Sequence, residues 1–209
     1  MWAVVVAAGG GTRFGGAKQY ARVGGRRVLD WSLDAARSSV DGVVLVVAPD
    51  RLLDPEPGAD RVVAGGRTRS QSVRAGVKAV PCDATIVVVH DGARPLARPV
   101  LFEAVIGAVR DGADAAVPGV ALVDSVRHRD RGALDRDGLV AVQTPQAFRA
   151  AALRSALGTD ADATDDATLV ERAGGRVVVV DGDPANAKVT LPADLDLAAS
   201  HLASDEGRR

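Results

Sequence analysis

Short runs of consecutive apolar residues alternate along the chain with longer segments in which apolar positions recur every three or four residues. Continuous apolar runs are typical of strands that are covered on both faces, and the spaced pattern is typical of amphipathic helices. The runs predict buried strands at residues 2–8, 42–48, 61–64, 85–90, 113–118 and 176–180. The spaced segments predict helices at residues 28–39, 68–80, 98–111, 149–156, 165–173 and 193–202.

This alternation of strands and helices predicts an α/β fold with a doubly wound, mostly parallel sheet and right-handed crossovers. The chain has 209 residues, the size of one such domain, so we expect residues 1–209 to form a single domain. Ligands of doubly wound sheets bind beyond the carboxyl ends of the strands, where the strand order reverses. We therefore expect the catalytic and ligand-binding residues in the loops that follow the predicted strands.

One stretch, at about residues 120–144, breaks the alternation. Two β-like segments at residues 120–129 and 139–144 flank a charged, turn-prone segment at residues 130–138. This pattern predicts a long hairpin arm rather than another crossover helix. An arm with little core of its own needs a surface to pack on, so we expect it to mediate a homodimer.

Composition and charge exclude several classes of protein. The chain is 47% hydrophobic and 25% charged, which is typical of a globular protein and rules out intrinsic disorder. A net charge of -1 and an aromatic content of 3% argue against a nucleic-acid partner. A single cysteine excludes a disulfide framework, and the apolar runs are too short to span a membrane. We therefore expect a cytoplasmic enzyme or binding domain.

The balance between the two basic residue types is unusual. Of the 26 basic residues only Lys18, Lys78 and Lys188 are lysines, so arginine serves wherever a general surface cation is needed. A lysine in this chain is therefore a candidate for a role that needs a compact charge with three donors. Each of the three can also be a plain solvated residue, as Lys78 on a predicted helix is expected to be.

The first predicted strand runs into a glycine-rich loop, residues 9–16, followed by Lys18. Glycines leave backbone N–H groups free to cradle a polyphosphate. Phe14 replaces the third glycine of a dinucleotide-binding fingerprint, and Gln19 replaces the magnesium-binding Ser or Thr of a P-loop. The loop instead offers two cations, Arg13 and Lys18, to one phosphate chain. The alternative is a flexible turn with solvated charges.

Asp91 follows another very apolar strand, in the segment His90-Asp91-Gly92-Ala93-Arg94-Pro95. A carboxylate at the end of a strand in such a sheet can hold Mg²⁺, or another divalent cation, beside the phosphates of a nucleotide. The alternative is an Asp-Gly turn in which Asp91 is a cap. We expect His90 to make structural hydrogen bonds rather than to act as a general base.

Two further segments carry polar groups. Residues 64–72 contain Gly66, Arg69 and Ser72 at a strand-to-helix junction, where side chains and free amides suit contacts to a base, ribose or phosphate; Thr68 or Ser70 can instead simply cap the helix. Residues 186–190 contain Lys188, which is either a phosphate-binding cation or one solvated lysine.

Together these motifs resemble the family of 2-C-methyl-D-erythritol 4-phosphate cytidylyltransferases of the non-mevalonate isoprenoid pathway. The resemblance covers about residues 3–203 and implies a Rossmann-like nucleotidyltransferase sheet with a protruding β-arm. It rests on the glycine-rich loop with Lys18-Gln19-Tyr20, on residues 90–95, and on Thr144-Pro145-Gln146, Thr164-Asp165-Asp166-Ala167 and Lys188-Val189-Thr190. The chain departs from the family pattern at Ala17, Arg67 and Ser125, where the family often has proline, an acidic residue and threonine.

The resemblance also implies roles for individual residues. Arg13 and Lys18 match cations that act on the α-phosphate, Lys188 matches the lysine that positions the attacking phosphate, and Asp91 matches the aspartate at the Mg²⁺ site. Arg136 in the arm matches an arginine that binds the acceptor of the neighbouring subunit. The implied nucleotide-binding residues are Ala7, Ala8, Gly9, Gly10, Gly11, Gly66, Arg69, Ser72, Asp91 and Ala93, and the implied substrate-binding residues are Arg94, Ser125, Arg136, Thr144 and Lys188.

The implied reaction joins CTP to 2-C-methyl-D-erythritol 4-phosphate and releases pyrophosphate. A phosphate monoester oxygen is already a nucleophile near neutral pH, so the reaction needs alignment and charge stabilisation rather than a general base. Two alternatives remain at this point. One is a cytidylyltransferase that acts on ribitol 5-phosphate, and the other is a non-catalytic nucleotide-binding protein on the same scaffold.

Overall fold

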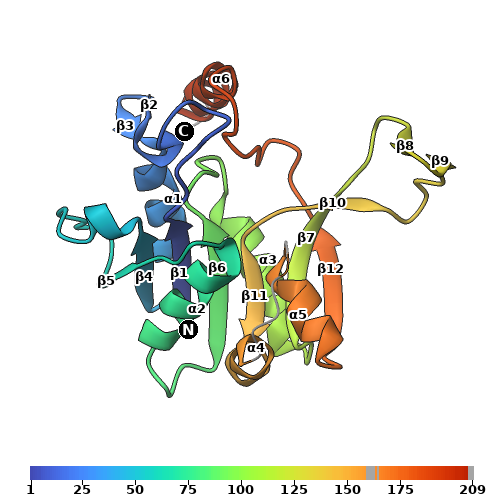
Figure 1. Ribbon diagram of the computed structural model, residues 1–209, viewed down its shortest axis with the longest axis horizontal. Helices are drawn as coiled ribbons and strands as arrows, with labels where there is room; N and C mark the ends of the chain where they lie inside the picture. Colours follow the sequence, from blue (N-terminus) through green and yellow to red (C-terminus); the bar gives the residue numbers. More distant parts are fainter. Residues whose placement is uncertain (159–162, 164, 207–209) are drawn as a thin grey trace.

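The computed structural model describes residues 1–158, 163 and 165–206. Thr164, part of one motif discussed above, lies outside the described residues. A central sheet runs through the molecule with helices on both of its faces, and a slender arm projects from one end (Figure 1). This is the α/β arrangement with a mostly parallel sheet that the sequence predicts.

Four parallel strands form one half of the sheet, in the order β6-β1-β4-β5. They are β1 (Trp2–Ala7), β4 (Gly42–Val47), β5 (Arg61–Ala64) and β6 (Ile86–Asp91). From β1 the chain moves outward to β4 and then β5, and then returns to place β6 on the other side of β1. The strand order therefore reverses between β1 and β6, so the loops after these two strands open side by side.

The other half of the sheet is mixed. The strands β7 (Ala115–Ala121) and β12 (Val177–Asp181) pair in parallel, and β11 (Gln146–Arg149) lies antiparallel between β6 and β7. The strand prediction missed β11, since it is four residues long and directly precedes a helix. Its Ala147 and Phe148 are fully buried, so this short strand joins the two halves of the core.

Helices cover both faces of the sheet. On one face lie α1 (Val28–Arg37) and α3 (Pro99–Arg110), and on the other lie α2 (Arg69–Ala79), α4 (Ala150–Leu157) and α5 (Asp166–Arg172). Successive residues of β1 point into opposite layers, so that Val5 packs with α1 and α3 whereas Val4 packs with α2. Two covered faces explain why the strands are continuously apolar.

A third, smaller core lies beside the sheet. The last helix, α6 (Asp194–Glu206), packs against the hairpin of β2 (Arg22–Val23) and β3 (Arg26–Arg27), as Figure 1 shows. Phe14 of the glycine-rich loop and Val189 pack in this cluster. The body also contains two short 3-10 helices, η1 (Lys18–Tyr20) and η2 (Pro49–Arg51). The loop around Phe14 and the segment around Val189 thus share an apolar anchor.

The arm begins as an extension of the sheet. The strand β10 (Val140–Val142) pairs antiparallel with the end of β7, and beyond it β8 (Val126–His128) pairs with β9 (Gly132–Leu134) in a separate hairpin. This hairpin projects away from the body in Figure 1. Val123, Leu134, Leu139 and Val140 are exposed apolar residues of this region.

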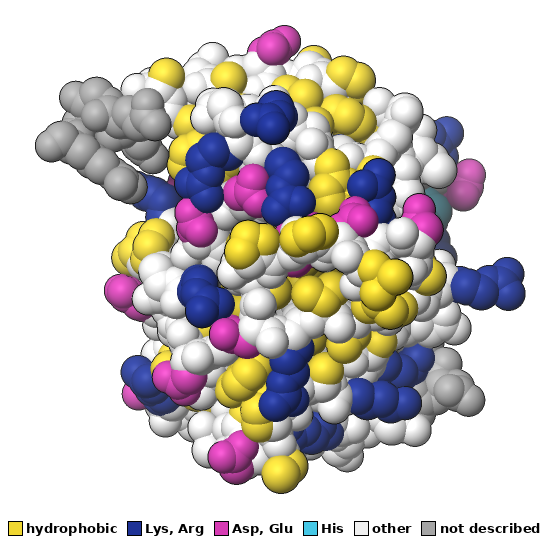
Figure 2. Space-filling model, turned by 90° about the vertical axis from the view of Figure 1, so that its left-hand side faces the viewer, with side chains coloured by type: hydrophobic (Ala, Val, Ile, Leu, Met, Phe, Trp, Pro, Cys, Tyr) yellow, Lys and Arg dark blue, Asp and Glu magenta, His cyan; other side chains and the backbone are white. Residues whose placement is uncertain are grey.

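The surface elsewhere is mixed. The side of the molecule turned toward the viewer in Figure 2 intersperses apolar side chains with cations and anions. Within the part of the chain that the structure describes, no helix combines the length and apolarity needed to cross a membrane.

Candidate active site

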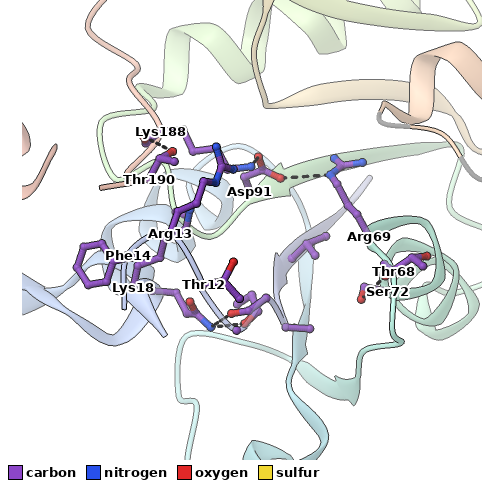
Figure 3. Close-up of a pocket in the computed structure, with 18 of the residues that line it drawn as sticks. Thr12, Arg13, Phe14, Lys18, Thr68, Arg69, Ser72, Asp91, Lys188 and Thr190 are labelled. Atoms are coloured by element: carbon purple, nitrogen blue, oxygen red, sulfur yellow. Dashed lines mark hydrogen bonds and ion pairs between the residues drawn. The ribbon is translucent and has the colours of Figure 1, made fainter. Parts of the chain in front are cut away.

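A cavity of about 350 Å³ opens where the strand order reverses. Four segments that are distant in sequence line it: the end of β1 with the glycine-rich loop, the β5–α2 junction, the end of β6, and the segment around Lys188 (Figure 3). Most of the predicted site residues lie here, namely Ala7, Ala8, Gly9, Gly10, Gly11, Arg13, Lys18, Gly66, Arg69, Ser72, Asp91, Ala93 and Lys188.

The glycine-rich loop turns sharply on Gly11. The carbonyl oxygen of Gly11 accepts hydrogen bonds from the amides of Phe14, Gly15 and Gly16 at 2.9–3.2 Å. Gly11 has φ +65°, and a Cβ at this position would lie 1.8 Å from the carbonyl oxygen of Gly16. Only glycine fits this turn, which swings Arg13 and Lys18 toward the same space.

Gln19 fastens the loop to the strand that precedes it. Its side chain is 3% exposed, and its Nε2 donates to the carbonyl oxygens of Ala7 at 2.7 Å and Gly9 at 3.1 Å. Sequence reasoning compared Gln19 only with the magnesium-binding residue of a P-loop and missed this role. The signal for it is an amide side chain directly after a glycine-rich loop, where the backbone has carbonyl groups to satisfy.

Asp91 ends β6 in the middle of the site. Its Oδ2 accepts a hydrogen bond from Lys188 Nζ at 2.6 Å, and its Oδ1 lies 3.6 Å from Arg69 Nε. Burial raises the pKa of the Asp91 carboxyl, but the charges of Lys188 and Arg69 outweigh it and hold the pKa well below its usual range. Asp91 is therefore a firmly ionised carboxylate and not merely the cap of a turn.

Four cations, from three segments of the chain, face this carboxylate. Burial lowers the pKa of Lys18, and the nearby charges of Lys188 and Arg13 lower it further. In Figure 3, Arg13, Lys18 and Lys188 lie to one side of Asp91 and Arg69 lies to the other. Cations held this close repel one another, and this repulsion destabilises the site unless bound anions offset it. The cavity is therefore suited to an anionic ligand that carries several charges.

The β5–α2 junction closes a second side of the cavity. Thr68 caps α2 by accepting a hydrogen bond from the Gln71 amide, as the capping interpretation predicts. Ser72 Oγ accepts a hydrogen bond from the Gly66 amide at 3.1 Å. A Cβ on Gly65 would lie 2.4 Å from the Cβ of Ala8, so this turn packs directly on the glycine-rich loop.

Asp166 supports a residue of the cavity, and sequence reasoning quoted it in a motif without giving it a role. It is fully buried at the start of α5, and its Oδ2 accepts from Arg69 Nη1 at 2.5 Å. Burial raises the pKa of Asp166, with Arg69 opposing that shift. The carboxylate fixes the guanidinium of Arg69 from behind while Nε faces Asp91.

His90 and Thr144 are internal. His90 is fully buried, and burial lowers its pKa to about 4, so it is neutral at physiological pH. Thr144 Oγ1 lies 3.2 Å from His90 Nδ1 and accepts from the Asp91 amide at 3.0 Å. His90 thus has the structural role expected of it, and Thr144 holds the end of β6 but does not line the cavity.

The remaining predicted residues lie away from the cavity of this chain. Arg94 donates from Nη1 to the carbonyl oxygen of Asn186 at 2.6 Å, so it supports the segment before Lys188. Ser125 and Arg136 are exposed on the arm, where Arg136 donates to the carbonyl of Val123. The structure does not bring Arg94, Ser125, Arg136 or Thr144 into the lining of the cavity.

Sequence reasoning gave no role to two buried amide side chains in the same region. Gln143 directly follows β10, and Asn186 is two residues before Lys188. Their side chains contact one another, with Asn186 Nδ2 donating to Gln143 Oε1 at 3.3 Å. Nothing in the local sequence pairs these positions, which are 43 residues apart.

The chain matches a known protein family over almost its whole length. The family model described as 2-C-methyl-D-erythritol 4-phosphate cytidylyltransferase matches residues 1–204. A protein of that name from Nocardia farcinica is 42% identical, over 96% of this chain and 93% of its own length. One from Streptomyces coelicolor is 44% identical, over 96% and 84%.

Solved structures with the same fold carry the same name or a synonym of it. The crystal structure of 2-C-methyl-D-erythritol 4-phosphate cytidylyltransferase from Thermus thermophilus superposes with a TM-score of 0.84 at 32% identity, covering 96% of this chain and 98% of that one. The 4-diphosphocytidyl-2C-methyl-D-erythritol synthase from Anaerococcus prevotii gives a TM-score of 0.83 at 31% identity, covering 97% of each chain.

Proposed function

Because the chain belongs to the 2-C-methyl-D-erythritol 4-phosphate cytidylyltransferase family, we propose that it joins CTP to 2-C-methyl-D-erythritol 4-phosphate and releases pyrophosphate. The observation that carries this proposal is the meeting of Arg13, Lys18, Arg69 and Lys188 around the Asp91 carboxylate in one cavity. Such a site suits a reaction between two anionic phosphates, since the cations offset their mutual repulsion.

The chemistry is a displacement at the α-phosphorus of CTP. An oxygen of the acceptor phosphate forms the new P–O bond, the bond to the bridging α–β oxygen breaks, and pyrophosphate leaves with that electron pair. The attacking oxygen is already anionic, so no proton needs to be removed. Among the described residues no histidine lines the cavity, which agrees with a mechanism of alignment and charge stabilisation.

The nucleotide side of the site is assigned to the glycine-rich loop and the β5–α2 junction. The turn at Gly11 leaves the loop backbone open to the triphosphate, and Arg13 with Lys18 would stabilise negative charge on the α-phosphate. Gly66 and Ser72 lie across the cavity, where they would contact the cytosine. Lys188 would bind the acceptor phosphate from the remaining side.

Asp91 fits a divalent cation, and we assign Mg²⁺ or a similar ion to it. Within the described residues no group of three or more metal-ligating side chains gathers by itself. Mg²⁺ commonly binds through one or two carboxylates together with substrate phosphates, so a single ionised carboxylate beside a phosphate site is a suitable donor set. The ion, when bound, neutralises charge on the phosphates of CTP.

The arm supports a second assignment, a homodimer. Its apolar residues are exposed, and Ser125 and Arg136 lie on it away from the cavity of their own chain. In a symmetric dimer the same arm can reach the site of the partner subunit. Arg136 would then contact the acceptor phosphate that Lys188 of the other chain binds.

The identity of the acceptor is tested by measuring pyrophosphate release. With CTP and Mg²⁺, we expect turnover with 2-C-methyl-D-erythritol 4-phosphate and little with ribitol 5-phosphate, and we expect chelation of the metal to abolish it. Turnover with ribitol 5-phosphate alone would replace the acceptor proposed here. A protein that binds CTP but turns over neither acceptor would be a binding protein.

The three lysines provide a matched set of variants. Lys18→Ala and Lys188→Ala should each lower kcat by about a hundredfold, since removing one donor to transition-state charge costs about 3 kcal/mol. Lys78→Ala, on the exposed side of α2, should keep normal turnover. All three variants should stay folded, and near-normal turnover of either of the first two would remove the role assigned to that lysine.

The proposal that each arm serves the partner subunit is tested by combining two variants in one dimer. Chains carrying Arg136→Ala and Lys188→Ala are coexpressed with different tags and purified through both. If each arm serves the partner, one of the two sites is intact and the heterodimer keeps roughly half of the wild-type rate. The control heterodimer pairs Lys18→Ala with Lys188→Ala, and it should stay inactive because one chain supplies both lysines of a site. Equal rates in the two heterodimers, or a monomeric mass, would refute the assignment.

A further inference from the structure

The side chain of Gln143 is buried at the base of the arm and holds the segment that leads to Lys188. It is 8% exposed. Its Nε2 donates to the carbonyl oxygens of Asp183 at 2.8 Å and Asn186 at 3.4 Å. Its Oε1 accepts from the Asp183 amide at 3.2 Å and from Asn186 Nδ2 at 3.3 Å. All of the hydrogen-bonding capacity of this carboxamide is thus directed at residues 183–186.

Asn186 extends the contact toward the site. It is fully buried, and its Nδ2 also donates to the carbonyl oxygen of Thr144 at 2.9 Å. Its own carbonyl oxygen accepts from Arg94 Nη1 at 2.6 Å. We name Gln143 and Asn186, with their mutual hydrogen bond, the amide clamp. The clamp thus joins the end of β10 to the segment that leads to Lys188 and, through Arg94, to the loop after Asp91.

Lys188 depends on this support because no regular element holds it. Residues 182–190, between β12 and α6, are neither helix nor strand. Beyond the clamp, the Val189 amide donates to the carbonyl oxygen of Ala93 at 2.9 Å, and the Lys188 ammonium contacts Asp91. The chain on either side of Lys188 is therefore held by the clamp and by Ala93, and Asp91 holds Nζ itself.

The clamp also ties Lys188 to the arm. Gln143 directly follows β10, and its amide donates to the carbonyl oxygen of Pro118 in β7 at 2.8 Å. Both strands continue into the arm that carries Arg136. A shift of the arm base would move Gln143, and with it the segment before Lys188.

We propose that Gln143 is a positioning residue. It places the Lys188 ammonium for the acceptor phosphate and couples the position of that ammonium to the position of the arm. This inference rests on the role proposed above for Lys188. Gln143 does not line the cavity and acts through Asn186. Its loss should therefore affect the acceptor side of the reaction and leave the CTP side nearly untouched.

A double-mutant cycle between Gln143 and Lys188 tests the inference. Gln143→Met keeps the length of the side chain but removes the four contacts. We expect kcat/KM for the acceptor to fall roughly ten- to a hundredfold, since a misplacement of about 1 Å can cost about a hundredfold. The KM for CTP should stay within about twofold, and in the Lys188→Ala background Gln143→Met should change turnover by less than about twofold.

Two controls keep a general folding defect apart from mispositioning. Arg98→Ala removes the ion pair that Arg98 makes with Asp183 at 2.8 Å on the exposed side of the same segment, and it should leave both KM values and kcat unchanged. If Gln143→Met does not fold, Gln143→Glu keeps the shape and turns an oxygen toward two carbonyl groups. It should give the same selective loss on the acceptor side.

The possible outcomes separate the inference from the function on which it rests. Independent, multiplying losses from Gln143→Met and Lys188→Ala would overturn the inference alone, as would an equal rise of both KM values. Normal turnover of Lys188→Ala by itself would refute the role of Lys188 and the inference with it.

Discussion

The ion pair between Asp91 and Lys188 is the contact on which the site depends. It joins the carboxyl end of a fully buried strand to a segment that has no regular structure of its own. The apolar run of β6 fixes where Asp91 lies, and β1 beside it fixes where the glycine-rich loop begins. The sheet thus places one anion at a defined point, and cations from three other segments are arranged around it.

This arrangement explains how a chain of near-zero net charge can act on two anionic phosphate substrates. The charges are balanced over the whole molecule but concentrated at the reversal of the strand order, where Arg13, Lys18, Arg69 and Lys188 face a single carboxylate. Asp166 holds the Arg69 guanidinium in place, and Gln19 holds the backbone at the start of the glycine-rich loop. Catalysis by alignment needs such rigid support more than it needs a group that moves protons.

Sequence reasoning succeeded where a local pattern of residue types has a single physical explanation. Continuous apolar runs predicted the six main strands, and the scarcity of lysine together with the glycine-rich loop pointed to Lys18 and Lys188. It failed where a partner is distant in sequence. The strand β11 is too short to show a period, and the contacts of Asp166 with Arg69 and of Gln143 with Asn186 join positions far apart along the chain. Buried polar side chains are satisfied by tertiary contacts, which a single sequence does not reveal.

The same scarcity of lysine permits one direct measurement of the central claim, that Lys18 and Lys188 meet at a metal–nucleotide site organised by Asp91. Lysine labelled with ¹³C at Cε gives three side-chain signals. With CTP present and Mn²⁺ in place of Mg²⁺, paramagnetic broadening should remove the signals of Lys18 and Lys188 and spare that of Lys78. The broadening should be lost in Asp91→Asn. A sharp Lys188 signal in the ternary complex, or unchanged broadening in Asp91→Asn, would contradict the account.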